Sequence, residues 1–376
     1  MEYLSLKFET GHHLRIRDER FLQTREELEE FLAGEKHLHT KSFAKDVMFS
    51  HELKANNQIE GYNDDVKLVR EIIEKRYPNT NSEQAKRILN LYHGYNYILR
   101  EKEINPESLK KLYSILSKNL LEPNDEARMG EYYRTDKVYI LFRGNLSCIP
   151  DEGIEAARIE EFMNAYFEFL NNLDYSGNIT DEYIKSQILH FYFVYIHPYF
   201  DVNGRTSRTM AMWYLLNKKA YPYIIFNRGI AFKGNNYDRA IIDVKKYHDI
   251  SFFIDFMLKT VQVELEKEYI MQSIQNASSE KFSNQDWQTL LYLLSMNGLI
   301  TASSFVNTYN KFHDKKRAKL IYETMLDPLI QKNILKVTRT TSSCMFDDYP
   351  NEVLEFNPKI MDYDKSKIRR LILYKD

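Results

Sequence analysis

The sequence lacks the features of several protein classes. Only two cysteines occur in 376 residues, and Cys148 and Cys344 lie far apart, which argues against a disulfide framework or a cysteine-rich zinc site. No apolar run reaches the ~18 residues of a membrane span, and the N-terminus shows no basic-then-apolar signal pattern. Basic and acidic residues nearly balance, at 52 and 54, so no overall nucleic-acid or membrane signature is present. We therefore expect a cytoplasmic protein without membrane contact.

Glycine and proline are also scarce, at 12 and 9 residues, and this scarcity favours a mainly α fold. Apolar residues recur at helical spacing along most of the chain. One stretch breaks this period, because residues 130–142 are rich in β-forming residues and are followed by the turn residues Arg143-Gly144-Asn145. We expect a short β-hairpin there, between helices.

The polar loop at 197–208 is the most informative stretch, and it separates two strongly apolar helical patterns. His197 can accept a hydroxyl proton near neutral pH, and Asp201 is a hard oxygen ligand suited to Mg²⁺. The Asn203–Gly204 pair can hold a phosphoryl oxygen at the start of the second helix, where backbone N–H groups favour anions. Arg205 and Arg208 can bind further phosphates. The loop therefore predicts phosphate chemistry.

This loop resembles the signature of Fic-domain proteins, His-x-Phe-x-Asp/Glu-Gly/Ala-Asn-Gly-Arg-x-x-Arg. Six functional positions match it: His197, Asp201, Asn203, Gly204, Arg205 and Arg208. The resemblance implies a helical core that transfers AMP from ATP to a protein hydroxyl with Mg²⁺. It further implies that His197 is the general base, Asp201 the metal ligand, Asn203–Gly204 the anion hole, and the two arginines the triphosphate contacts.

The resemblance extends to two other segments of the chain. The run Gly130-x-x-x-Arg134-x-x-x-Val138-Tyr139-Ile140 is similar to the flap strand with which the family binds an extended target segment. Plain core packing of this hairpin is the alternative. Tyr237 is similar to a residue of the helix that closes over the adenine side, which implies a nucleotide contact.

The segment Asn56-Asn57-Gln58-Ile59-Glu60-Gly61 resembles the family's inhibitory motif, Ser/Thr-x-x-x-Glu-Gly/Asn. A Glu60 carboxylate against Arg208 would occupy the place and the charge complement of the γ-phosphate. We therefore expect Glu60 to be autoinhibitory, the alternative being an ordinary solvated glutamate.

Three residues depart from the family's patterns. Tyr199 stands for the usual Phe and adds a hydroxyl that needs a partner. Val202 stands where Gly or Ala is usual, and its β-branched side chain restricts φ and could crowd a phosphate. Asn56 replaces Ser or Thr of the inhibitory motif without touching the carboxylate of Glu60.

Near residue 275 the composition shifts to Ser, Asn and Glu, which suggests a linker. Beyond it, helical patterns at 286–296, 301–309 and 315–326 followed by β-like pieces predict a winged helix-turn-helix-like domain. Residues 281–376 hold 15 Lys and Arg against 11 Asp and Glu. We thus predict an N-terminal extension at 1–54, a Fic core at 55–274 and a winged-helix-like domain at 281–376.

Several alternatives stay open. The group transferred could be UMP, phosphate or phosphocholine, or AMP could be removed rather than added. The C-terminal domain could contact DNA through Lys315, Lys316 and Arg317, which would make the chain a nucleotide-sensing transcriptional regulator, or it could dock a protein or form a homodimer. The absence of a Gly-Lys-Ser/Thr loop argues against a P-loop enzyme.

Overall fold

The computed structural model separates the chain into two compact units, Met1–Glu264 and Leu265–Asp376. It describes residues 3–34, 36–62, 66–74, 79, 81–140, 151–232, 234–278, 299–312, 316–346 and 349–356. The division falls within the long helix α13 (Ser251–Ser278), which continues past the residue where composition suggested a linker. The domain limits expected from the sequence remain predictions.

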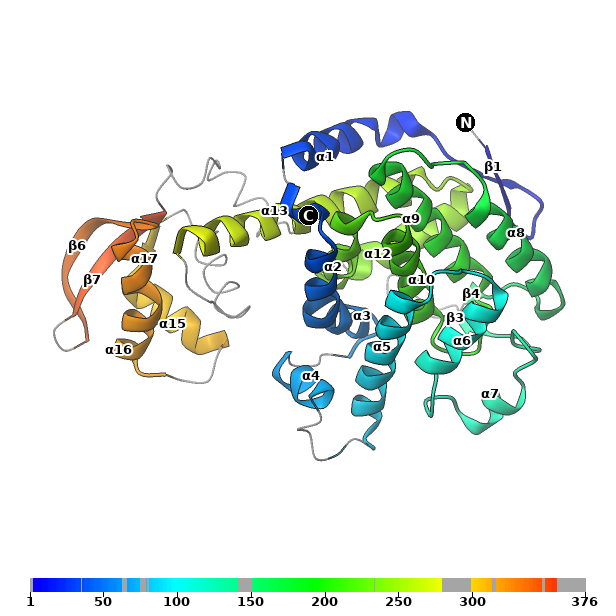
Figure 1. Cartoon of the computed structure of the whole chain (residues 1–376), viewed down its shortest axis with the longest axis horizontal. Coiled ribbons are helices and arrows are strands. Elements are labelled where there is room, and N and C mark those ends of the chain that lie inside the picture. Colours follow the sequence, from blue (N-terminus) through cyan, green and yellow to red (C-terminus); the bar gives the residue numbers. More distant parts are fainter. Residues whose placement is uncertain are drawn as a thin grey trace. The chain divides into compact units, whose positions relative to one another are not determined.

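The first unit is built almost entirely of helices (Figure 1). Its elements up to the motif helices are β1 (Tyr3–Lys7), β2 (His13–Arg15), η1 (Asp18–Arg20), α1 (Leu22–Gly34), η2 (Lys36–His39), α2 (Lys41–Val47), η3 (Met48–Glu52), α3 (Leu53–Ile59), α4 (Val66–Ile73), α5 (Glu83–Arg100), α6 (Pro106–Leu116), α7 (Pro123–Ala127), β3 (Tyr139–Ile140), β4 (Asp151–Glu152), η4 (Ala156–Arg158) and α8 (Ile159–Asn171). The remaining elements are α9 (Ile179–Ile196), α10 (Asn203–Asn217), η5 (Tyr221–Ile225), α11 (Phe226–Phe232), α12 (Gly234–Tyr247) and α13.

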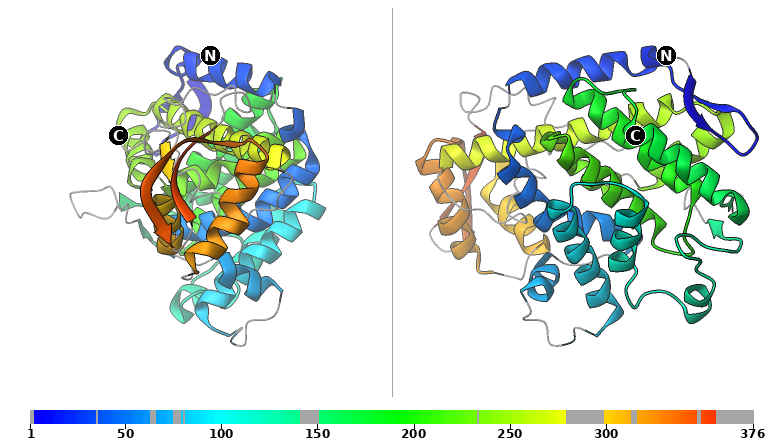
Figure 2. Two further views of the ribbon diagram at one scale, coloured as in Figure 1. Left: turned by 90° about the vertical axis from the view of Figure 1, so that its left-hand side faces the viewer. Right: turned by 45° about the vertical axis from the view of Figure 1, so that its right-hand side comes forward.

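Helices α9 and α10 form the centre of this unit and pack against each other (Figures 1 and 2). Every residue of α9 from Tyr183 to Ile196 is buried, as expected of a helix that is apolar on all sides. Helix α10 is also buried along most of its length, including the arginines near its start. The polar loop between them is therefore held by two core helices, which gives its side chains a rigid base.

Local sequence signals explain where several helices begin. Ser82 and Asn178 accept hydrogen bonds from backbone N–H groups at the starts of α5 and α9. Asn105 forms a capping box with Ser108 before α6, and Pro106 is its first residue. Residues 41–59 form a series of α2, the π-helical turn η3 and α3.

The described part of the second unit contains one three-stranded antiparallel sheet in the order β5-β7-β6. Its elements are β5 (Leu299–Thr301), α15 (Ala302–Phe312), α16 (Ala318–Ile321), η6 (Tyr322–Leu326), α17 (Asp327–Gln331), β6 (Leu335–Phe346) and β7 (Tyr349–Phe356). The expected helix at 286–296 and Lys315 lie outside the described residues, so the winged-helix assignment and the DNA contact stay predictions.

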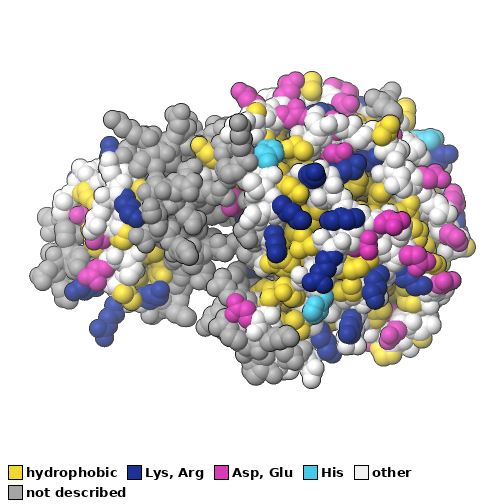
Figure 3. Space-filling view, viewed as in Figure 1, with side chains coloured by type: hydrophobic (Ala, Val, Ile, Leu, Met, Phe, Trp, Pro, Cys, Tyr) yellow, Lys and Arg dark blue, Asp and Glu magenta, His cyan; other side chains and the backbone are white. Residues whose placement is uncertain are grey.

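Charge is unevenly distributed on the face of the first unit that Figure 3 shows. Acidic side chains gather along the edge of α1, which carries Glu26, Glu27, Glu29 and Glu30, whereas Lys and Arg side chains lie among hydrophobic ones in the middle of the face. Among the described residues, no helix combines the length and apolarity needed to cross a membrane.

Candidate active site

His197 ends α9 in a left-handed conformation, with φ 51°, and its backbone N–H donates to Phe193 O. Its Nδ1 lies 3.3 Å from Val194 O, and this carbonyl favours the tautomer in which Nδ1 carries the proton. Nε2 is then free to accept one. Burial lowers the pKa of His197 to about 4, outweighing the opposite effects of the Val194 carbonyl and Glu60. The imidazole is therefore neutral at pH 7.

The side chain of Asn203 closes the loop. Its Oδ1 accepts from Tyr199 N at 3.0 Å, and its Nδ2 donates to Tyr199 O at 2.8 Å. Both ends of the amide thus hold the loop backbone, so any anion contact by Asn203 stays a prediction.

Val202 adopts φ 66°, a left-handed conformation that is unusual for a β-branched residue and costs roughly 1–2 kcal/mol. The side chain is 1% exposed and therefore lies in the core. The restriction on φ expected from the sequence thus appears here as backbone strain at the start of α10.

Glu60 and Arg208 form an ion pair at the start of α10. Arg208 Nη2 lies 2.5 Å from Glu60 Oε1, and Nε donates to Asn56 Oδ1 at 2.8 Å. Arg208 is 1% exposed, whereas 27% of the Glu60 side chain is exposed. A Cβ on Gly204 would collide with the same Glu60 carboxylate, so only glycine leaves room for it. The expected pairing of Glu60 with Arg208 is thus present in the structure.

Arg205 and Asp201 form a second, longer ion pair in this loop. Arg205 is 3% exposed, its Nη2 is 3.7 Å from Asp201 Oδ2, and its Nε has no hydrogen-bond partner among the described residues. Asp201 Oδ1 accepts from Val202 N at 2.6 Å, and 55% of its side chain is exposed. Arg205 thus retains donor capacity beside an accessible carboxylate.

Asp201 is a suitable ligand for Mg²⁺, although no group of three or more His, Cys, Asp or Glu side chains gathers anywhere in the described part of the chain. Mg²⁺ is commonly held by one or two carboxylates together with substrate phosphates and water. A single exposed carboxylate, of which only Oδ1 accepts a backbone hydrogen bond from the loop, fits that donor set.

Tyr237 lies in α12 and is only 4% exposed. Its hydroxyl is 2.9 Å from His190 Nε2 and within hydrogen-bonding reach of Arg208. The structure therefore brings Tyr237 to the buried side of Arg208, and its contact with a nucleotide remains a prediction.

The expected hairpin is present only as the two-residue antiparallel pair β3 and β4, with Tyr139 opposite Glu152 and Ile140 opposite Asp151. Residues 130–138 form bends and an isolated bridge instead of the expected strand. Tyr139 is 62% exposed and Ile140 is buried. The turn expected at 143–145 lies outside the described residues. Gly153 follows β4, and a Cβ there would meet the side chains of Arg134 and Val138 and the β-carbon of His197, so the base of the hairpin lies beside His197.

Arg134 holds the hairpin to the motif loop. Its Nε donates to His197 O at 2.9 Å, Nη1 to Asp136 O at 2.6 Å and Nη2 to Ile154 O at 2.5 Å. The sequence motif marked Arg134 as part of the flap but not as its anchor. The contributions of Gly153 and Asn56 were missed, because no local pattern indicates which distant atoms approach them.

Comparison with known proteins matches residues 103–215 to the model of the Fic/DOC family. The chain contains a Fic domain. The matched residues include His197, Arg208 and the strand β3, but they begin after Glu60.

Two proteins named "Protein adenylyltransferase Fic" are similar to this chain. The one from Nematostella vectensis is 24% identical over 234 residues, which cover 59% of this chain and 49% of the relative. The one from Culex quinquefasciatus is 32% identical over 165 residues, which cover 42% and 29% respectively. The chain thus spans half or less of the length of these relatives.

Solved structures show the same fold. A Fic family protein from Desulfovibrio desulfuricans G20 aligns with a TM-score of 0.56 at 16% identity, covering 90% of this chain and 96% of the other. Fic-1 (residues 134–508) from C. elegans aligns with a TM-score of 0.50 at 16% identity, covering 68% and 72%. The mainly α Fic fold expected from the sequence is confirmed.

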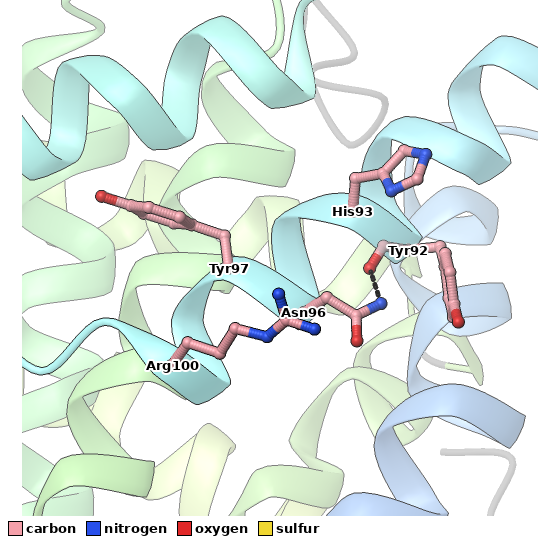
Figure 4. A pocket seen from close by; sticks show the side chains of 5 residues that line it. All are labelled: Tyr92, His93, Asn96, Tyr97 and Arg100. Carbon is pink, nitrogen blue, oxygen red and sulfur yellow. Dashed lines mark hydrogen bonds between the residues drawn. The ribbon is translucent and has the colours of Figure 1, made fainter.

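A surface hollow of about 410 Å³ lies away from these residues, on the outer side of α5. It is lined by Tyr92, His93, Asn96, Tyr97 and Arg100, all from one helix, and Figure 4 shows their side chains spread along its exposed side. Because none of the loop residues lines this hollow, it is not part of the candidate active site.

Proposed function

We propose that this protein is a Fic-type adenylyltransferase, which transfers AMP from ATP to a Ser, Thr or Tyr hydroxyl of a target protein. The observation that carries the proposal is that the buried, neutral imidazole of His197 shares one short loop with the start of α10, where Gly204, Arg205 and Arg208 are groups suited to bind an anion. The names of the similar proteins support the same chemistry.

In this proposal ATP lies along the start of α10, with its outer phosphates on Arg205 and Arg208. Nε2 of His197 takes the proton of the target hydroxyl as the oxygen attacks the α-phosphorus. The bond from that phosphorus to the bridging oxygen breaks, and pyrophosphate leaves with its electron pair. Mg²⁺ held by Asp201 would neutralise phosphate charge. The protein contributes positioning and fixed charge, and the target segment would lie along the exposed edge near Val138 and Tyr139.

Glu60 is autoinhibitory in this proposal. Arg208 cannot pair with the Glu60 carboxylate and a γ-phosphate at once, because both require the same side of its guanidinium group. The 2.5 Å contact between Glu60 and Arg208 supports this competition. ATP then binds weakly, or in a posture that misaligns the α-phosphorus.

Intact-mass measurement tests the proposal and identifies the donor. The Glu60→Gly protein is incubated separately with Mg²⁺–ATP and Mg²⁺–UTP. A gain of one AMP with ATP alone is expected, and the additional change His197→Ala should abolish it. A gain with UTP alone, or a gain of phosphate, would replace AMP transfer by another reaction. Undiminished labelling of the His197→Ala protein would remove His197 as the base.

A further inference from the structure

The inhibitory segment is held at a second place, about two helical turns before Glu60. Glu52 is the last residue of η3, and its side chain is completely buried. Its Oε2 accepts from the backbone N–H of Asn227 at 3.1 Å, and its Oε1 lies 3.5 Å from Nε of Arg228. Both partners belong to α11, so a buried carboxylate joins the start of α3 to that helix.

A second carboxylate shares the same arginine. Oε2 of Glu264, in α13, lies 4.0 Å from Arg228 Nε, and the Arg228 and Glu264 side chains are 13% and 9% exposed. Two nearly buried carboxylates thus face one guanidinium. Burial raises the pKa of Glu52 to about 8, with Arg228 acting in the opposite direction and Glu264 adding to the rise. Because burial disfavours the charged form, Glu52 relies on the guanidinium of Arg228 to stabilise its charge, and the carboxyl is mostly ionised only above about pH 8.

The stretch between Glu52 and Glu60 is tied to the same framework. Tyr95 of α5 donates through its hydroxyl to Glu52 O at 3.4 Å and accepts from Asn56 Nδ2 at 3.1 Å. Asn56 in turn accepts from Arg208. Helix α3 is therefore held by Glu52 at one end, Asn56 in the middle and Glu60 at the other end.

We propose that the buried cluster of Glu52, Arg228 and Glu264 positions α3 and thereby sets how strongly Glu60 competes with ATP for Arg208. The inference rests on the proposed function. Glu52 is a positioning residue, because it acts on Arg208 only through α3. Without the Glu52–Arg228 pair, α3 shifts more readily and withdraws Glu60 from Arg208. Glu264 competes with Glu52 for Arg228 and therefore weakens the Glu52–Arg228 pair. A change at Glu264 in α13 then alters how firmly Glu60 is positioned against Arg208.

The test uses the full-length chain at pH 9, where Glu52 is ionised, so that Glu52→Gln removes its charge. It measures the affinity for ATP by calorimetry and hydrogen exchange over Leu53–Ile59 by mass spectrometry. Glu52→Gln is expected to speed exchange in α3 and to raise ATP affinity about five-fold or more. Glu264→Gln should do the opposite, since Arg228 then serves Glu52 alone. Loss of a merely structural contact would change both variants in the same direction. Glu161→Gln, on the exposed side of α8, is the matched control and should resemble the wild type.

Removing the inhibitory carboxylate provides the decisive comparison. In a Glu60→Gly background, Glu52→Gln should leave ATP affinity unchanged, because no inhibitory carboxylate remains to be positioned. An equal rise in both backgrounds would overturn the inference, as would unchanged exchange over Leu53–Ile59 in Glu52→Gln. Failure of Glu60→Gly itself to raise ATP affinity would instead refute the proposed inhibition. If Glu52→Gln does not fold, the sign of the Glu264→Gln effect decides, and higher ATP affinity would contradict the inference.

Discussion

Oε1 of Glu60 lies 2.5 Å from Nη2 of Arg208, while Nε of the same guanidinium donates to Asn56 at 2.8 Å. Asn56 in α3 and Glu60 at the end of the same helix thus bind different nitrogen atoms of the Arg208 guanidinium. Nη2 also donates to Asn56 O at 3.4 Å, and in the proposed function the contact with Glu60 is the one that a phosphate displaces. The Glu60 side chain is 27% exposed, whereas that of Arg208 is 2% exposed, so Glu60 is the more accessible partner of the pair.

Replacing Glu60 by glycine should increase ATP binding and self-labelling by about ten-fold or more, because the competing carboxylate is gone. Labelled ATP with Mg²⁺ measures the rate, and calorimetry measures the affinity. Glu60→Gln is the matched control, because it retains the shape of the side chain without its charge, and it should give an intermediate increase. Equal labelling of the wild type and the Glu60→Gly protein would contradict the role of Glu60.

Labelling by the Glu60→Gly protein should vary little between pH 8 and pH 6 and should fall only towards pH 4. Burial lowers the pKa of His197 to about 4, so the imidazole can still accept a proton throughout the higher range. The same pKa shift determines how the free energy of unfolding changes with pH. The unfolded chain takes up this proton near pH 6.5, so the stabilising contribution is present above that pH and is lost as pH falls through 4. A midpoint of activity near 6.5 would show an ordinary, solvated histidine.

Arg134→Met should lower the free energy of unfolding by about 2–4 kcal/mol, because three carbonyl groups lose a charged donor. It should also expose the hairpin to protease. Arg128→Met is the control, because Arg128 is 45% exposed and its solvent-screened ion pairs with Asp125 and Asp136 should contribute much less to stability. Urea unfolding of both variants measures the difference, and equal losses would contradict the anchoring role.

Tyr199→Phe should raise the free energy of unfolding by about 1–2 kcal/mol, because the buried Tyr199 hydroxyl has no hydrogen-bond partner among the described residues. The ring still stacks on Tyr113, with centroids 3.5 Å apart. Tyr192→Phe makes the same chemical change with the opposite expected sign, since the Tyr192 hydroxyl donates to Lys7 O at 2.9 Å. Thermal unfolding of both variants decides, and destabilisation by Tyr199→Phe would show that its hydroxyl has a partner.

Local signals in the sequence predicted much of the fold and the loop. The apolar patterns of α9 and α10 and the caps at Ser82 and Asn105 depend on neighbouring residues, so they can be recognised without tertiary contacts. The π-helical turn η3, which separates α2 from α3, has no distinct residue pattern, so the sequence does not predict it.

The sequence by itself determined which chemical groups the loop carries, from His197 to Arg208, because they lie within twelve consecutive residues. It also marked Glu60 and the strand near Val138 through resemblance. Only the tertiary structure decided that Glu60 meets Arg208, that Arg134 ties the hairpin to His197 and that the imidazole is neutral through burial. These relations join residues about 60 to 150 positions apart, and such contacts depend on how the helices pack rather than on local pattern.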